Sequence, residues 1–149
     1  MRIRGHHLAC VYCYLGSDKS TSEGFFGIRN TIPDLLNKLR EEPELDVTVA
    51  VDMDGVCEFC PLAVSQGCGR GKDPVAQNEK LCAWDRAILD RLGLVPGDRL
   101  PAQKIEQLLR ERIPNIGEIC ANCTSASPSG WREYQIGISK GIWGHSSAR

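Results

Sequence analysis

The feature that most constrains this chain is a group of cysteines near its middle. The stretch from residue 56 to residue 68 reads VCEFCPLAVSQGC and holds Cys57, Cys60 and Cys68, with Pro61 directly after the second thiol. An Asp-Gly pair precedes it and a glycine-rich run follows, so the segment is predicted to be a loop. Three small core residues would gain little packing in a loop, and we therefore interpret these cysteines as ligands of a metal centre.

The C-x-x-C spacing recurs along the chain. It occurs three times, at Cys10/Cys13, Cys57/Cys60 and Cys120/Cys123. Two intervening residues bring both sulfurs to one side of a tight turn, where they can bind one metal or neighbouring irons of one cluster. The central group lacks a fourth ligand, and the pair Cys120 and Cys123 is the best source of it. Cys82 lies inside a predicted helix and is expected to be a core residue.

The spacing leaves the metal open between two candidates. Zinc is usually held by two paired knuckles, and the zinc-ribbon spacing is absent. Iron–sulfur clusters are often held by three grouped cysteines and a remote fourth, and Cys-Pro is frequent at their ligands. The grouping and Pro61 favour an iron–sulfur cluster, with a zinc-stabilised binding module as the alternative. A thiol oxidoreductase is a third reading, although Pro61 argues against the helix start that such a C-x-x-C pair normally occupies.

Composition indicates the class of protein and the compartment in which these thiols occur. The chain has 149 residues, 42% of them apolar and 25% charged, with a net charge of −1. One domain over residues 1–149 can bury a core of its own, so small size does not force disulfides. No basic run indicates nucleic acid, and no segment reaches the ~20 apolar residues of a membrane span. Without a signal peptide, we expect a cytoplasmic protein whose thiols stay reduced.

Hydrophobic periodicity predicts a helix-rich α+β domain with two short strands and cysteine-bearing loops. The strands are expected at residues 2–4 and 45–51, and if they pair, the intervening helices form the crossover that a parallel pairing needs. The helices are expected at 6–16, over 21–41 as one helix kinked at Pro33 or as two abutting helices, at 74–92 and at 101–113. Residues 115–123 are expected to form a short turn or helix, and residues 124–149 a loop and tail.

The N-terminal segment adds two histidines to the candidate ligands. If residues 6–14 are helical, His6, Cys10 and Cys13 lie on one face. His7 then points about 100° away, so the two histidines are not expected to share a metal easily. The segment is open to three interpretations: a packing helix, a second metal centre, or a histidine that bonds to the main centre. Cys10 and His6 are therefore second-tier ligands, and either histidine could act as an acid–base group in a metal-assisted enzyme.

Four segments, RIRGHHLACVYCYLG, GVCEFCP…GC, AILDRLGLVPGD and EICANC, occur in this order over residues 2–123. They resemble a family of short bacterial and archaeal proteins that is catalogued as a domain of unknown function and suspected of binding an iron–sulfur cluster. The more specific marks are the His-His-Leu-x-Cys start, the Cys-x-x-Cys-Pro motif, Cys68 and the last C-x-x-C pair. Cys13 and Cys82 look like additions in this chain. Family members usually continue with a tryptophan and a further cysteine, whereas here Trp131 is followed by none.

Together these observations predict an iron–sulfur protein, of the [4Fe–4S] type, that serves in electron transfer or in redox or iron sensing. Its expected ligands are drawn from Cys57, Cys60, Cys68, Cys120 and Cys123. A redox partner protein is the expected partner, and neither the residues nor the resemblance indicates a reaction.

Overall fold

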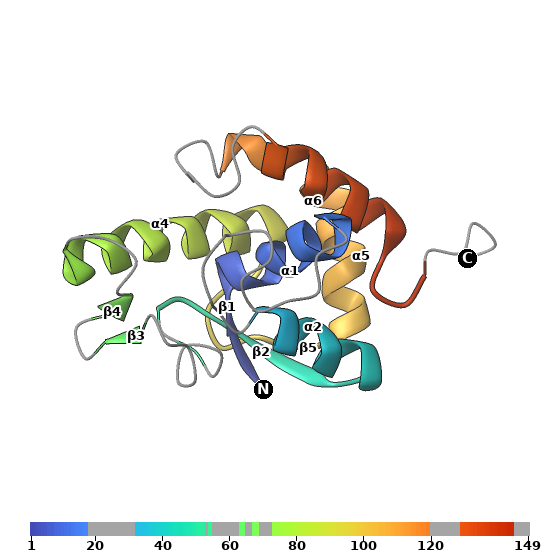
Figure 1. Cartoon of the computed structure of the whole chain (residues 1–149). Coiled ribbons are helices and arrows are strands. Elements are labelled where there is room, and N and C mark those ends of the chain that lie inside the picture. The colour runs from blue at the N-terminus through green and yellow to red at the C-terminus, as the bar shows by residue number, and fades with distance from the viewer. Residues whose placement is uncertain are drawn as a thin grey trace.

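The computed structural model describes residues 1–17, 32–52, 54, 73–119 and 129–144, with the short segments 63–64 and 67–68. The helices are α1 (Gly5–Ser17), α2 (Ile32–Glu41), α4 (Pro74–Leu92), α5 (Ala102–Arg112), the 3-10 helix η1 (Ile116–Glu118) and α6 (Ser129–Lys140). The strands are β1 (Arg2–Arg4), β2 (Asp46–Ala50), β3 (Ala63–Val64), β4 (Gly67–Cys68) and β5 (Arg99–Pro101). This helix-rich arrangement with small sheets confirms the predicted α+β class (Figure 1).

The main sheet has the strand order β1-β2-β5. Strands β1 and β2, both expected from the sequence, are parallel neighbours, with Ile3 opposite Val49. Strand β5 adds an antiparallel edge that was not predicted, with Leu100 opposite Val47. A second pairing joins β3 and β4 and sets Cys68 opposite Ala63. Because β1 and β2 run in parallel, their carboxyl ends meet at one edge of the sheet.

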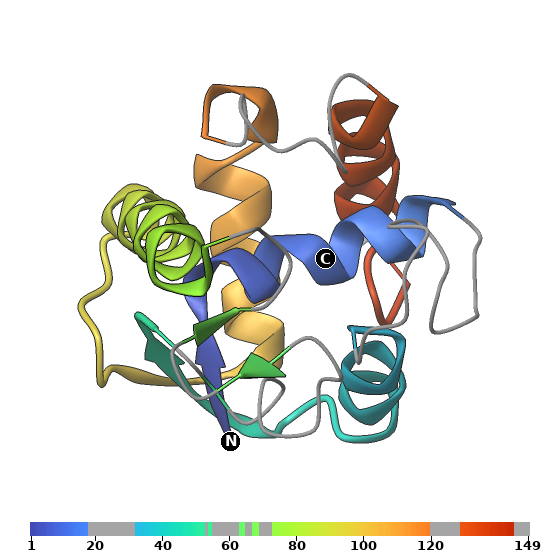
Figure 2. The same cartoon turned by 60° about the vertical axis from the view of Figure 1, so that its left-hand side comes forward.

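Helix α1 lies in the middle of the molecule. Figures 1 and 2 show it surrounded by α2, α4, α5 and α6, with the sheet at its N-terminal end. Nine of its thirteen residues are buried, which is the pattern of a helix covered on several sides rather than along one stripe. The sequence GHHLACVYCYLGS carries no Asp, Glu, Lys or Arg, so burying this helix removes no such charged side chain from water.

Helix α4 has the ends that its sequence predicts. The Asp73 carboxylate accepts hydrogen bonds from the backbone N–H groups of Val75 and Ala76, and Pro74 occupies the first helical position. Gly93 ends the helix in the left-handed conformation with a φ of 73°. These caps fix the two ends of α4, and its Asp85 meets the start of α1.

Two parts of the chain bear on the prediction. Helix α2 begins at Ile32, so Pro33 lies in its first turn, where proline is tolerated. Residues 21–31 of the predicted helix lie outside the described residues. Helix α6 replaces part of the predicted loop and tail, and it buries Tyr134 and Ile138. The helical pattern of α6 is weak in the sequence, because only one face of the helix is apolar and a glycine interrupts it.

That glycine explains how α6 packs. A Cβ at Gly137 would overlap the backbone carbonyl oxygen of Tyr12, and a Cβ at Gly16 would overlap that of Glu133. The backbones of α1 and α6 therefore touch directly at a pair of glycines. Ser and Ala could not occupy either site without separating the helices.

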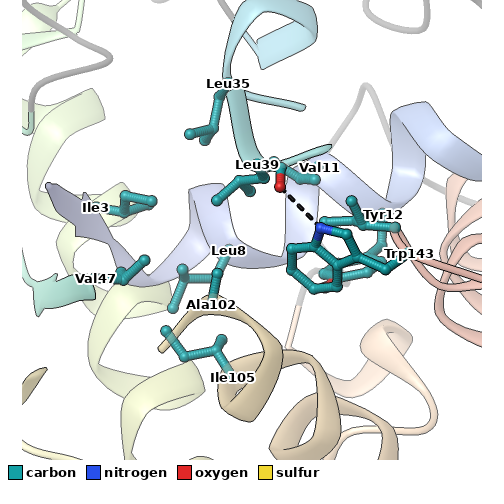
Figure 3. Close-up of a pocket in the computed structure, with 11 residues that line it drawn as sticks. Ile3, Leu8, Val11, Tyr12, Leu35, Leu39, Val47, Ala102, Ile105 and Trp143 are labelled. Carbon is teal, nitrogen blue, oxygen red and sulfur yellow. Dashed lines mark hydrogen bonds between the residues drawn. The ribbon is translucent and has the colours of Figure 1, made fainter. Parts of the chain in front are cut away.

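A small apolar cavity of about 20 Å³ lies between α1, α2, α5 and the sheet (Figure 3). Leu8, Leu39 and Ile105 contribute to its apolar wall, and the Trp143 indole N–H donates to the Leu39 carbonyl oxygen at 2.9 Å beside it. The volume is close to that of one water molecule, and the apolar lining gives water no hydrogen bonds. This cavity is a packing gap rather than a ligand site. Among the helices that the structure describes, none has the length and apolar run needed to cross a membrane.

Replacing Gly137 with alanine is expected to destabilise the fold by about 1–3 kcal/mol, because the added methyl group forces α6 away from Tyr12. Alanine is otherwise the better helix former by about 1 kcal/mol, so a loss of stability isolates the steric effect. Urea unfolding of Gly137→Ala against Gln135→Ala, an exposed position on the same helix, provides the comparison. Equal stability of the two variants would contradict the close contact.

Candidate functional site at the start of helix α1

One buried carboxylate connects four segments of the chain. Oδ1 of Asp85, on α4, accepts the His6 backbone N–H at 2.8 Å and lies 2.8 Å from Nδ1 of the His6 ring. Oδ2 of Asp85 accepts from Nε of Arg4 at 2.8 Å and from the Asp52 backbone N–H at 3.0 Å. Asp85 is fully buried, so its contacts with Arg4 and His6 lie away from water, whereas the contact with the exposed Asp52 is part-buried. They tie β1, α1, α4 and the turn after β2 together.

A second buried carboxylate repeats the arrangement beside the first. Oδ2 of Asp54 accepts the Arg4 backbone N–H at 2.8 Å and lies 2.9 Å from Nδ1 of His7. Asp54 follows strand β2 and is 3% exposed. Each of the two adjacent histidines is thus held at Nδ1 by a carboxylate from a different element.

The topology explains why these groups meet. The carboxyl ends of the parallel strands β1 and β2 lie at one sheet edge, a usual place for binding sites in α/β sheets. Helix α1 begins there directly after Arg4, and a Cβ at Gly5 would clash with the backbone of Asp85. Gly5 therefore allows the first turn of α1 to approach α4 closely enough for His6 to reach the carboxylate.

Arg4 balances the buried charge. Its guanidinium is 1% exposed and, besides Asp85, contacts Oδ1 of Asn78 at 3.3 Å and Sγ of Cys82 at 3.6 Å. Asn78 in turn donates to Oδ1 of Asp52 at 2.7 Å. Asp52 has a φ of 80°, a conformation that is uncommon for a residue with a side chain, and its N–H is thereby part of the same network.

The two imidazoles lie next to each other. Their ring centres are 4.4 Å apart with the planes inclined at 59°, and the Trp84 ring meets His6 edge-on at 6.3 Å. The sequence-based expectation that His7 points away is therefore wrong as regards the rings. The carboxylates explain the difference. Asp85 on α4 and Asp54 in the turn after β2 each hold one ring, and these contacts bring the rings together although the two residues are adjacent on a helix. The His6 and His7 side chains are only 10% and 13% exposed.

Burial fixes the protonation of His6. Burial, with a smaller effect of neighbouring His7, lowers the pKa of His6 from 6.5 to about 4 against the opposing pull of Asp85. Burial alone raises the pKa of Asp85, but the hydrogen bonds and charges of His6 and Arg4 outweigh it and the net pKa is lowered. At neutral pH a neutral imidazole thus faces a carboxylate, which can only accept. The proton of His6 is consequently on Nδ1, and Nε2 carries a lone pair.

The cysteines predicted as ligands are mostly outside the described residues. This is true of Cys57, Cys60, Cys120 and Cys123, and for Cys68 only the backbone position in β4 is described. Their role as metal ligands stays a prediction. Among the described residues, Asp54 and strands β3 and β4 are the neighbours of the central cysteines in the sequence.

The remaining cysteines are described. Cys13 and Cys82 are buried and Cys10 is partly buried. Burial raises the pKa of Cys82, in keeping with the core role expected of it. Within the described ranges, no three His, Cys, Asp or Glu side chains gather in a way that could hold a metal ion. His6, Cys10 and Cys13 by themselves do not form the second centre that was considered.

Sequence reasoning missed Arg4, Asp54 and Asp85. Asp85 had a visible signal, because it follows Leu81 by four residues and precedes Ile88 by three, on the apolar stripe of α4. A carboxylate at a core position of a helix indicates a buried polar partner. Asp54 sits in the Asp-Met-Asp-Gly turn, where an acidic residue has many ordinary explanations. Its contact with His7 depends on the strand pairing.

Fold and site define a small α+β protein with a pair of carboxylate-held histidines at the carboxyl edge of a parallel strand pair. Over residues 23–128 the chain matches the family described as "Protein of unknown function (DUF1284)", and it belongs to that family. The matched stretch includes Cys57, Cys60, Cys68 and the last C-x-x-C pair, and begins after the two histidines. Searches of curated proteins and of solved structures gave no significant match.

Replacing Asp85 with alanine is expected to lower the free energy of unfolding by about 3–5 kcal/mol, because Arg4 would be left as an unpaired buried charge. Denaturant unfolding measures the effect. Asp90→Ala on the same helix removes an exposed carboxylate and is expected to change stability by no more than about 0.5 kcal/mol. A loss at Asp85 as small as that at Asp90 would show that the network does not support the fold.

Acid is expected to destabilise the folded state through His6. The ring has a lower pKa in the folded than in the unfolded state, so its contribution is complete above about pH 6.5 and is lost as the pH falls towards about 4. The loss amounts to about 3 kcal/mol for a shift of this size. Unfolding at a series of pH values in EDTA should show this slope in the wild type. His6→Asn keeps a donor for Asp85 without titrating, and its slope over that window should be shallower by that amount.

Proposed function

We propose that this protein binds an iron–sulfur cluster of the [4Fe–4S] type and serves in electron transfer or in redox or iron sensing. Cys57, Cys60 and Cys68 are the proposed central ligands, and Cys120 or Cys123 supplies the fourth. When bound, the cluster would supply one-electron redox chemistry, with its potential set by thiolate ligation, nearby amides and burial. A redox partner protein is the proposed partner.

The observation that carries the proposal is the anchoring of Asp54. This residue is held in the polar network by Arg4 and His7, and Cys57 follows it by three residues. Three residues span at most about 11 Å, so the first central cysteine is tethered to the buried edge where β1 and β2 end. A cysteine segment that starts from a buried, hydrogen-bonded point loses less entropy on binding a cluster than one on a free loop.

The hairpin of β3 and β4 supports the same location. Its pairing sets the Cys68 backbone opposite Ala63, three residues after Cys60. Figure 1 shows the hairpin beneath the N-terminal part of α4, the helix that also carries Asp85. The backbone of the third central cysteine is thus held beside the helix whose Asp85 holds His6. The donor set fits an iron–sulfur centre, because soft thiolates are the ligands that such clusters prefer.

Metal analysis of anaerobically purified protein tests the proposal. We expect about four irons and four sulfides per chain and visible absorption that a reductant bleaches. Cys57→Ser and Cys60→Ser are expected to lose most of the iron. Cys82→Ala is the matched control, since this buried thiol is not a proposed ligand, and it should retain the cluster.

The other outcomes discriminate between the alternatives. Colourless protein with stoichiometric zinc, and unfolding on chelation, would replace the cluster by a zinc-stabilised module. Metal-free protein in which one C-x-x-C pair cycles reversibly between dithiol and disulfide would point instead to a thiol oxidoreductase. Either result overturns the iron–sulfur proposal.

A further inference from the structure

We infer that His6 and His7 together bind one divalent first-row metal ion through their Nε2 atoms. This site uses none of the cysteines of the proposed cluster, so it stands or falls independently of that proposal. Two protein ligands come from the first turn of α1, and solvent would fill the other positions.

The first argument is the orientation of the lone pairs. Nδ1 of His6 and of His7 each face a carboxylate oxygen, at 2.8 and 2.9 Å. A carboxylate accepts, so in the neutral ring Nδ1 holds the proton and Nε2 holds the lone pair. Within the described part of the chain, no hydrogen bond is made to Nε2 of either ring, although both side chains are nearly nine-tenths buried. An unpaired lone pair on a largely buried ring is costly because little water reaches it, and a cation would relieve that cost at both rings.

The second argument is the spacing of the rings. With a metal–nitrogen bond of about 2.1 Å and a nitrogen about 1.1 Å from the ring centre, two imidazoles on one metal have centres about 4.5 Å apart at a right angle and about 5.2 Å apart at a tetrahedral angle. The observed separation is 4.4 Å. The spacing therefore matches two positions at about a right angle around a single ion, as in octahedral coordination, and is shorter than the tetrahedral spacing.

The third argument is the support behind the ligands. A metal-binding histidine almost always donates its other N–H to a carboxylate, a carbonyl or water, which orients the ring and raises its basicity. Here both histidines have a fully buried carboxylate side chain in that position, and the two come from different elements, Asp85 from α4 and Asp54 from the turn after β2. Asp85 is itself fixed by Arg4 and the Asp52 N–H. Such duplicated support is more than ring packing alone requires.

The ligand chemistry selects the class of ion. Imidazole nitrogen suits Zn²⁺, Fe²⁺, Co²⁺ and Ni²⁺, whereas Mg²⁺ and Ca²⁺ prefer oxygen ligands. Cobalt is the most informative probe, because thiolate ligation adds an intense near-ultraviolet charge-transfer band that imidazole ligation lacks. The full chain, isolated anaerobically with whatever cysteine-bound metal it carries, is titrated with Co²⁺ by calorimetry and absorption.

We expect one Co²⁺ per chain, without the thiolate band, and paramagnetic shifts of the ¹⁵N resonances of His6 and His7 but not of His145, the third histidine. His6→Ala and His7→Ala are each expected to weaken binding at least about tenfold, and Asp54→Asn, which removes the support but keeps the ligand, about 10–100-fold. His145→Ala is the matched control and should bind as the wild type does.

Binding that survives both His6→Ala and His7→Ala, or that appears only with the thiolate band and leaves the two histidines unshifted, would overturn the inference. So would the absence of Co²⁺ binding. If a variant fails to fold, the histidine resonances of the wild type decide the question by themselves. Iron and sulfide content is measured separately, so the failure of this ion site and the failure of the proposed cluster are distinguishable.

Discussion

The carboxylate of Asp85 is the group on which the arrangement of this protein depends. It carries a negative charge in a fully buried position, a state that is stable only when every acceptor site has a partner. Arg4 neutralises it, while the backbone N–H groups of His6 and Asp52 and the His6 ring complete its hydrogen bonds. Because those partners belong to β1, α1 and the turn after β2, one side chain on α4 sets where three other segments end or begin.

The central helix converts this local order into the overall fold. Helix α1 starts at the network, passes through the middle of the molecule and meets α6 through Gly16 and Gly137. Its first turn is held by polar contacts, and its last turn is held by the close approach of two backbones. The polar first turn of α1 is thereby fixed in position, because the apolar rest of the helix cannot easily shift. Close-packed interiors transmit displacement rather than absorb it.

The network also defines what chemistry this edge can support. The neutral His6 imidazole directs its proton to a carboxylate and presents a lone pair and not a charge, which suits a metal or a hydrogen-bond donor more than an anion. Cys57 follows the buried Asp54 by three residues in the sequence. The two imidazoles lie at the end of the sheet where binding sites usually form.

Local signals in the sequence determined the strands β1 and β2, the helix of α1, the caps of α4 and the family to which the chain belongs. Alternation, capping residues and cysteine spacing act over a few residues, so they can be recognised without the fold. The tertiary structure alone decided that Asp85 and Asp54 support the two histidines, that β5 extends the sheet and that α6 forms. These features depend on contacts between residues as far apart as His6 and Asp85, and no local pattern encodes which of many acidic side chains will be buried beside a given imidazole.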